Sequence, residues 1–399
     1  MHFCSWLMLM QKVFSAVTWS HLTFILFVLA IKLFECLSFQ KLWSNTRLFS
    51  HSQKELTLVH SSSDDSIREI DVAVVGKIII DEYYGQNHPV NGSNPLNIRL
   101  GGGSVQAAFG ARLWNNNVGI VAPFGKDFDE KMLETFKAFD IDTSGISILA
   151  EYLTPTVKVW YEGENMHFHG SSGWDRWDDL LQEPIHLPPS YNKAKVLHAI
   201  LEKGGSAEAD VLCAQRRLHP DCLISVEPVF IDSIDSELCN RVARTCCFAN
   251  VVSPDWNGAC QIASMEENSS PEVVLPACAR VLQMKGINFA QVLIVRRGSI
   301  GSYLWCSVDP SSVHHIPALT GIKVVDPTGA GNAFAGAFAS VLGTALWKTP
   351  QLSSQDLLHL QLDAARKATL TGAITVESDG LPQSLEIAKQ TISEKDTNI

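Results

Sequence analysis

Residues 321–332 read GIKVVDPTGAGN and carry the clearest structural signal in the chain. The stretch opens with a β-branched run that predicts a strand, passes through a glycine-rich turn and enters an apolar helical pattern at Phe334, Phe338 and Leu342. Glycines let the backbone approach a ligand, and the N–H groups at a helix start attract anions. The stretch therefore predicts a strand–turn–helix unit that suits phosphate, although a single turn of this kind fits a purely structural connection equally well.

Short apolar runs alternate with helical patterns on the N-terminal side of this stretch. The runs lie at residues 70–76, 117–122, 195–198, 223–226, 249–252 and 291–296. This alternation predicts a doubly wound parallel α/β sheet flanked by helices. Residues 83–100 and 154–169 interrupt it and, being polar at alternate positions, predict a small accessory sheet with a hairpin at residues 157–169. A dinucleotide-binding oxidoreductase is disfavoured because no G-x-G-x-x-G follows the first strand.

The composition indicates a globular chain. Of 399 residues, 46% are hydrophobic and 18% charged, and the net charge is −11. These values exclude a wholly disordered chain and disfavour nucleic-acid binding through a basic face. The ten cysteines include no C-x-x-C pair and predict reduced, buried thiols.

The first 68 residues form an N-terminal extension of distinct composition. Residues 13–31 carry no Asp, Glu, Lys or Arg, and this length just reaches the roughly 20 residues that span a bilayer. A membrane or targeting anchor, an organellar transit peptide and an extended gene model with a downstream start all remain open. We expect a folded domain at residues 69–390, itself cytoplasmic unless residues 13–31 anchor it or it is imported, and a tail at residues 391–399.

Three further stretches, together with the end of the opening one, carry a family resemblance. GKIIID at residues 76–81, GGGSVQAA at 101–108, RRGSIG at 296–301 and DPTGAGNAF at 326–334 stand in the order of the motifs of the PfkB (ribokinase-like) carbohydrate kinases, which the chain resembles. The resemblance covers roughly residues 69–384. It implies a large α/β domain with a small β lid, which would come from the two interrupting segments.

The resemblance also implies an activity and its residues. The activity is ATP-dependent phosphoryl transfer to a hydroxyl of a sugar or sugar-like small molecule, with Mg²⁺ and in some members a monovalent cation. Family members often pair through the lid, which implies a homodimer. The matching positions are Asp81, Gly102, Gly103 and Gln106 for the substrate; Gly329, Ala330 and Gly331 for the anion hole; Arg296, Gly298 and Gly301 for the nucleotide; Asp326 and Thr328 for a monovalent cation; and Asp255 for the magnesium network.

One departure from the family pattern bears directly on activity. Asn332 stands where the family has its catalytic Asp, and losing a general base typically costs about 10²–10⁴ in rate. A kinase that works without this base, with Asp326 or the substrate taking the proton, is one interpretation. The other is a pseudokinase, a ligand-binding or scaffold protein that retains the fold. Asp81 and the anion-hole glycines favour the kinase, whereas Asn332 and Gly258, which replaces a Glu of the magnesium motif, favour the pseudokinase.

Overall fold

The computed structural model describes residues 57–58, 68–89, 93–163, 165–230, 235–282, 291–349 and 351–396. The apolar segment at residues 13–31 therefore lies outside the described residues. Within the described ranges, no helix is both long and apolar enough to cross a membrane.

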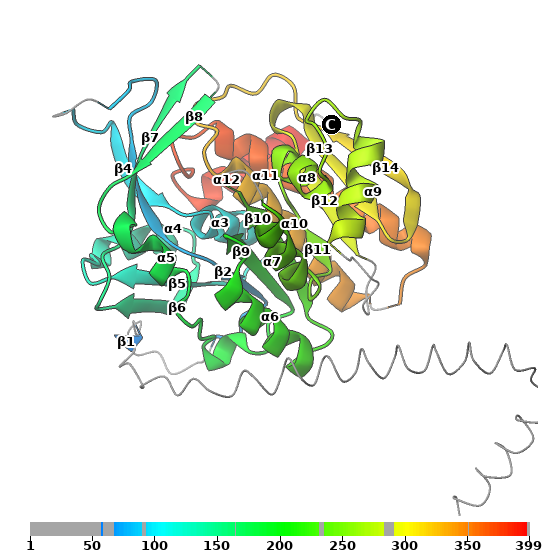
Figure 1. Ribbon diagram of the computed structural model, residues 1–399, viewed down its shortest axis with the longest axis horizontal. Helices are drawn as coiled ribbons and strands as arrows, with labels where there is room; N and C mark the ends of the chain where they lie inside the picture. The colour runs from blue at the N-terminus through cyan, green and yellow to red at the C-terminus, as the bar shows by residue number, and fades with distance from the viewer. Residues whose placement is uncertain are drawn as a thin grey trace, which may run out of the picture. The chain divides into compact units, whose positions relative to one another are not determined.

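A ten-stranded sheet forms the centre of the molecule (Figure 1). From β6 to β12 neighbouring strands are parallel, and antiparallel strands complete both edges. The predicted α/β class is confirmed, with an antiparallel edge that the sequence did not indicate. In spatial order the strands are β1 (Thr57–Leu58), β6 (Asp142–Leu149), β5 (Val118–Gly125), β2 (Val72–Val75), β9 (Val196–Glu202), β10 (Leu223–Val229), β11 (Val251–Val252), β12 (Val292–Arg296), β13 (Gly301–Cys306) and β14 (Asp309–Pro317).

Alternate residues of the parallel strands face two separate cores, because successive side chains of a strand point to opposite faces. Val72 and Val74 of β2 belong to one core, and Ala73 and Val75 to the other. The first core is covered by α3 (Ser104–Trp114), α4 (Leu133–Ala138), α10 (Ala330–Lys348), α11 (Ser354–Val376) and α12 (Leu385–Asp396). The second is covered by α6 (Ser206–Leu218), α7 (Ser236–Cys246), α8 (Trp256–Ala263) and α9 (Pro271–Val281).

A separate four-stranded sheet stands at the upper left of Figure 1. Its order is β4 (Asn97–Gly101), β3 (Ile79–Tyr83), β7 (Thr156–Glu162) and β8 (Asn165–Gly170), and β7 and β8 form the expected hairpin. The sheet begins earlier than expected, because β3 starts at Ile79. Asp81 consequently lies on a strand of the small sheet rather than at the end of the first strand of the large one.

Residues 321–326 do not form the expected strand. The amides of Val325 and Asp326 both donate to the carbonyl of Val376 at the end of α11, at 2.7 and 3.1 Å. The run is therefore held at the helix end and does not pair with the edge strand β14, and Val324 is exposed. The glycine-rich turn is therefore held by a helix end and not by the sheet.

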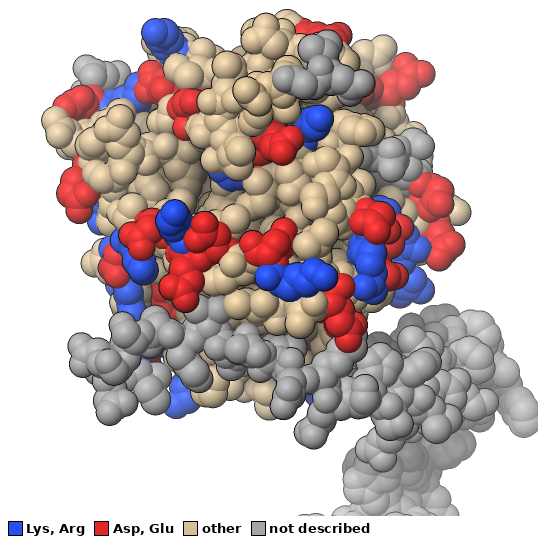
Figure 2. Space-filling view, turned by 90° about the vertical axis from the view of Figure 1, so that its left-hand side faces the viewer, with Lys and Arg blue, Asp and Glu red and all other residues tan. Residues whose placement is uncertain are grey.

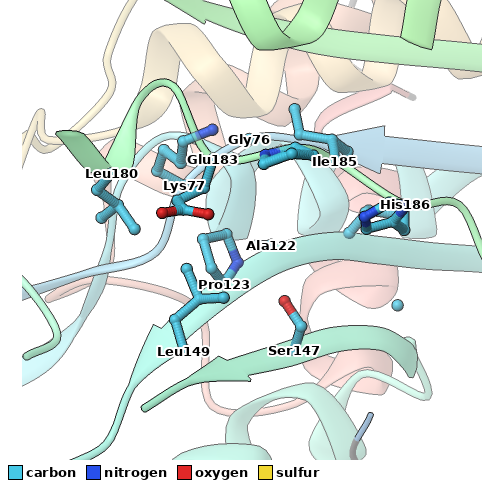
Figure 3. Close-up of a pocket in the computed structure, with 13 residues that line it drawn as sticks. Gly76, Lys77, Ala122, Pro123, Ser147, Leu149, Leu180, Glu183, Ile185 and His186 are labelled. Atoms are coloured by element: carbon cyan, nitrogen blue, oxygen red, sulfur yellow. The ribbon is translucent and has the colours of Figure 1, made fainter. Parts of the chain in front are cut away.

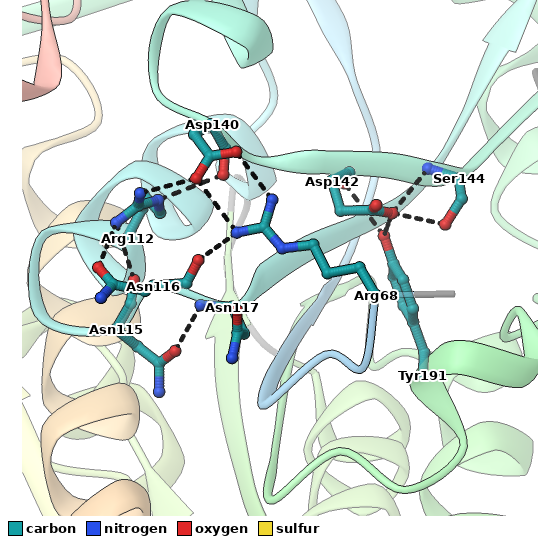
Figure 4. Close-up of polar contacts among 9 residues, drawn as sticks. All are labelled: Arg68, Arg112, Asn115, Asn116, Asn117, Asp140, Asp142, Ser144 and Tyr191. Carbon is teal, nitrogen blue, oxygen red and sulfur yellow. Dashed lines mark hydrogen bonds and ion pairs between the residues drawn. The ribbon is translucent and has the colours of Figure 1, made fainter. Parts of the chain in front are cut away.

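A polar cluster ties the start of the folded domain to the end of α4 (Figure 4). The Arg68 and Arg112 guanidinium groups both donate to the carboxylate of Asp140, at 2.8 and 2.9 Å. Burial acts to raise the pKa of Asp140, but the two guanidinium groups lower it below its ordinary value. Arg68 thus contacts the fold one residue before the expected boundary.

The cysteines and the C-terminal tail differ in part from what the sequence predicts. All eight cysteines in the described part of the chain are free, as expected, but Cys247 is exposed instead of buried. α12 extends through residues 391–396, within the expected tail, and buries Ile392. On the face shown in Figure 2, acidic and basic side chains lie next to one another, so neither sign of charge dominates that face.

Candidate active site

Two glycine-rich motifs meet where the N-termini of α3 and α10 lie side by side. Gly103 precedes α3 and Gly329 precedes α10, both with positive φ. A Cβ added to Gly103 would lie 3.0 Å from Asn332 Nδ2, and one added to Gly329 would lie 2.4 Å from Cγ of Gln106. Each motif therefore leaves room for a side chain of the other helix. The structure brings together Gly103, Gln106, Gly329 and Asn332, as the predicted site requires.

The contact between the two helices fixes this arrangement. A Cβ at Gly110 of α3 would lie 2.0 Å from the carbonyl oxygen of Ala333, and a Cβ at Gly336 of α10 would lie 2.0 Å from that of Ala107. Glycine at both positions lets the helix backbones touch. The backbone N–H groups at the start of α10 are thereby held at the site, where they suit an anion.

Asp81 reaches the same region from the small sheet. Its carboxylate lies over Gly101, where an added Cβ would come within 2.3 Å of both oxygens. Burial raises the pKa of Asp81 to about 7; Arg99 opposes this and Asp326 adds to it. A buried carboxylate of this kind is suited to accept hydrogen bonds from hydroxyl groups.

Arg99 links the small sheet to the glycine-rich turn. Its guanidinium lies 2.5 Å from Asp326 Oδ2 and 2.8 Å from Asp379 Oδ1. Beside it, the hydroxyls of Tyr161 on β7 and Thr328 in the turn are 2.7 Å apart. These contacts hold the small sheet against the large domain.

Asn332 faces a buried polar cluster at the carboxyl ends of the parallel strands. Its Nδ2 donates to Glu227 Oε1 on β10 at 2.8 Å, and Arg296 Nη1 on β12 lies 2.6 Å from the same oxygen. The guanidinium also reaches the anion hole, since a Cβ on Gly331 would lie 2.4 Å from Arg296 Nη1. Arg296 thus lies beside the predicted phosphate site.

The remaining predicted positions have local roles. Gly298 and Gly301 flank a short 3₁₀ turn with positive φ, and an added Cβ at Gly301 would meet Ile316 O at 2.1 Å. Asp255 caps α8 by accepting from the amide of Gly258 at 2.6 Å. Within the described residues, Asp255 forms no hydrogen bond or ion pair with Asn332 or Asp81.

Sequence reasoning missed Arg99 and Glu227. Glu227 is a carboxylate inside an apolar strand, and its position directly after residues 223–226 was a usable signal. For Arg99 the sequence offers no such signal, because its partners Asp326 and Asp379 are distant in sequence. A second buried pair, Lys77 with Glu208 at 2.9 Å, was also unforeseen.

A pocket lies between residues 121–123 of β5, residues 145–149 of β6 and residues 183–186 (Figure 3). None of the predicted site residues lines it. Its walls include Gly76, Lys77, Pro123, Ser147, Glu183 and His186.

Comparison with known proteins identifies the family. A model of the pfkB family carbohydrate kinases matches residues 69–388, and the chain belongs to this family. It is 24% identical to a ribokinase of Mus musculus over 273 residues, which cover 67% of this chain and 73% of the mouse protein. It is 27% identical to a cytidine kinase of Thermococcus kodakarensis over 247 residues, which cover 60% of this chain and 78% of that protein.

Solved structures share the fold. A ribokinase from Giardia lamblia superposes with a TM-score of 0.64 at 14% identity, covering 82% of this chain and 99% of that one. An Arabidopsis thaliana ribokinase, solved with ribose and ATP, has a TM-score of 0.59 at 16% identity and covers 81% of this chain and 99% of its own. At these identities the likeness establishes the ribokinase fold alone.

Proposed function

We propose that this protein transfers the γ-phosphoryl group of ATP to a hydroxyl of a sugar-like or nucleoside small molecule. The observation that carries the proposal is the meeting of the α3 and α10 N-termini, where Gly103 and Asn332 face each other. Ribokinase and cytidine kinase relatives support both acceptor classes.

Each group at the site has a role in this reaction. Asp81 accepts hydrogen bonds from acceptor hydroxyls, and Gly102 and Gly103 let the acceptor approach the backbone. The amides of residues 329–331, together with Arg296, stabilise the charge on the transferring phosphoryl group. The acceptor O–H bond breaks as its oxygen bonds to the γ-phosphorus, and the proton passes to an oxygen of the transferring phosphoryl group, because Asn332 cannot take it and both oxygens of Asp326 are engaged. The bond from the γ-phosphorus to the β-phosphate oxygen breaks, and ADP leaves. Positioning and electrostatics carry most of the catalysis in such transfers.

Magnesium would be held chiefly by the nucleotide. Asp255, the predicted member of the magnesium network, is engaged as the cap of α8, and Glu227 is engaged by Arg296 and Asn332. Mg²⁺ usually keeps several water ligands and binds substrate phosphates, whose negative charge it neutralises.

A monovalent cation at Asp326 and Thr328 does not fit this arrangement. Oδ1 of Asp326 accepts from both the amide and the hydroxyl of Thr328, at 3.0 and 2.6 Å. Oδ2 is paired with Arg99 at 2.5 Å. The guanidinium already supplies the positive charge, so we assign no step to a cation here.

The outer strands of the small sheet support the homodimer that we propose. β4 and the preceding residue expose Ile98 and Leu96, and β8 exposes Met166 and Phe168. Both strands lie at the edges of the sheet. Exposed apolar side chains on unpaired edges favour association.

The test is ATP consumption by the full chain with Mg²⁺ across ribose, fructose, cytidine and adenosine. Turnover that disappears in Asp81→Ala supports the proposal. ATP binding without turnover on any acceptor would instead make the chain a pseudokinase. If the chain neither binds ATP nor consumes it, the chain has kept the fold without the kinase activity.

A further inference from the structure

Four side chains from separate elements converge behind the anion hole. Glu227 of β10 contacts Asn332 of α10 and Arg296 of β12, while its Oε2 lies 3.7 Å from His198 Nε2 on β9. Glu227 is only 1% exposed, and Asn332 is the member of the cluster that reaches the α3 N-terminus. A buried carboxylate costs free energy unless it is paired and hydrogen-bonded. Oε1 of Glu227 is paired with Arg296 and accepts from Asn332, whereas Oε2 accepts no hydrogen bond within the described part of the chain.

The cluster holds a single compensated negative charge. Burial acts to raise the pKa of Glu227, but Arg296, His198 and the Asn332 amide bring it below its ordinary value. Arg296 is paired with Glu227 and also donates to the carbonyl of Ser253. One guanidinium therefore balances one carboxylate directly beside residue 332.

We infer that Glu227 carries the negative charge that the family pattern places on residue 332 itself. Positions 227 and 332 form a complementary pair, of which one is a carboxylate and the other an amide. Glu227 accepts a hydrogen bond from Asn332 Nδ2 and so fixes the orientation of the Asn332 amide. No donor in the described part of the chain contacts Oδ1, which is left to receive an acceptor hydroxyl, a consequence that rests on the proposed function.

Glu227 is a positioning residue in this arrangement. It acts through the amide, because a carboxylate behind Nδ2 polarises the amide and strengthens the hydrogen bond that Oδ1 accepts. The acceptor itself is bound by Asp81. Removing the Glu227 charge should therefore lower kcat while leaving the acceptor KM nearly unchanged.

Because of this pairing, replacing Asn332 by the family's Asp should lower both stability and turnover. Asn332→Asp alone would place a second carboxylate oxygen 2.8 Å from Glu227 Oε1, where the amide nitrogen now lies. Two buried carboxylates at that distance cannot both ionise, so they would share a proton. Asn332→Asp with Glu227→Gln would return the site to one carboxylate and one amide.

The experiment is a double-mutant cycle on the full chain with Asn332→Asp, Glu227→Gln and the double variant. Thermal midpoints are measured at pH 6 and pH 8, and ATP turnover is measured with the best acceptor. We expect each single variant to lower the midpoint by about 3 °C or more and turnover at least tenfold. The double variant should recover most of the lost thermal midpoint. It should also turn over ATP at least tenfold faster than Asn332→Asp.

The pH dependence follows from the shared proton. Asn332→Asp raises a folded-state pKa above its unfolded value, so stability falls as pH rises and the midpoint deficit is larger at pH 8. The other groups that face Glu227 or act on it are Arg296, His198 and Glu202, and they are present in all four proteins. Differences between the variants therefore report the 227–332 pair.

Matched controls repeat both chemical changes elsewhere. Asn192→Asp alters an exposed asparagine, and Glu237→Gln removes one partner of an exposed pair with Arg241. Both should change midpoint and turnover little. If the effects of the two site variants simply add, or if Asn332→Asp alone raises turnover without losing stability, the inference is overturned. If no variant consumes ATP, the proposed function fails, and coupled or additive midpoints still support or overturn the charge pairing.

Discussion

Asp81 is the residue whose charge state should control acceptor binding. Its pKa of about 7 in the folded protein lies well above the ordinary value of 3.8 for an aspartate, chiefly because the carboxyl group is buried. Only the ionised form accepts hydrogen bonds from the acceptor with both oxygens. We expect the acceptor KM to fall as pH rises from 6 to 8, as steady-state kinetics would show.

Asp81→Asn should change the pH dependence of stability as well. Between pH 4 and 7 the unfolded chain loses the Asp81 proton and the folded chain keeps it, so the free energy of unfolding falls as pH rises. Three pKa units correspond to about 4 kcal/mol as an upper bound. The variant should therefore be more stable than the native chain at pH 8, measured by urea unfolding, while losing acceptor binding.

Glu202 offers a matched control for this prediction. Burial raises its pKa to about 7 too, with Glu208 adding to the shift. Glu202→Gln should remove a similar pH dependence of the free energy of unfolding without weakening acceptor binding. Equal losses of acceptor binding in both variants would contradict the role assigned to Asp81.

At the scale of elements, β4 is joined to the large domain through Arg99. The Asp326 side chain is 0% exposed, so removing the guanidinium leaves its charge buried and unpaired. Breaking a buried pair typically costs about 3–5 kcal/mol. Arg99→Met should lower the free energy of unfolding by an amount of this order, and should raise the Asp81 pKa further because Arg99 opposes that shift.

Arg241→Ala is the control for Arg99→Met. It breaks an exposed pair with Glu237 on α7, which is worth about 0.5 kcal/mol or less. Comparable losses in the two variants would show that Arg99 does not hold the small sheet.

The contact between α3 and α10 is the second feature at this scale. Gly336→Ala would place a methyl group 2.0 Å from the carbonyl oxygen of Ala107 and push the helices apart. Overpacking of this kind costs about 1–3 kcal/mol, and the displaced α10 carries the anion hole. We expect a lower melting temperature and a reduced kcat.

Gly372→Ala on α11 separates this effect from helix propensity. Outside its own helix, the nearest atom to its added Cβ in the described part of the chain is Ala330 O, at 3.8 Å. The same substitution should therefore stabilise the helix by roughly 0.5–1 kcal/mol. A loss of stability at Gly372 equal to that at Gly336 would argue against the close helix contact.

At the scale of the whole molecule, the edges of the small sheet should decide the oligomeric state. Ile98 and Phe168 are exposed on its two outer strands. Sedimentation of the native chain should show a dimer, and Ile98→Asp should shift it towards the monomer by placing a charge in the apolar contact. Val273→Asp, at an exposed position of α9, is the control and should leave the dimer intact.

The sequence by itself determined the parallel α/β class and the two glycine motifs. These features depend on near neighbours in the chain, since strand and helix periods and turn glycines act over a few residues. It also pointed to Asp81 and Asn332, because both belong to continuous motifs. The apolar run at residues 321–326 was misread because a local β pattern does not show whether the backbone pairs with a strand or, as here, with a helix end.

Only the tertiary structure decided what surrounds those residues. Glu227 and Asn332 are 105 residues apart in sequence and meet because β10 ends and α10 begins at the same edge of the sheet. Arg99 meets Asp379, 280 residues away, because the small sheet folds onto the large domain. Such contacts are set by strand order and helix packing, which leave no spacing pattern in the chain, and they determine where the charge of the site lies.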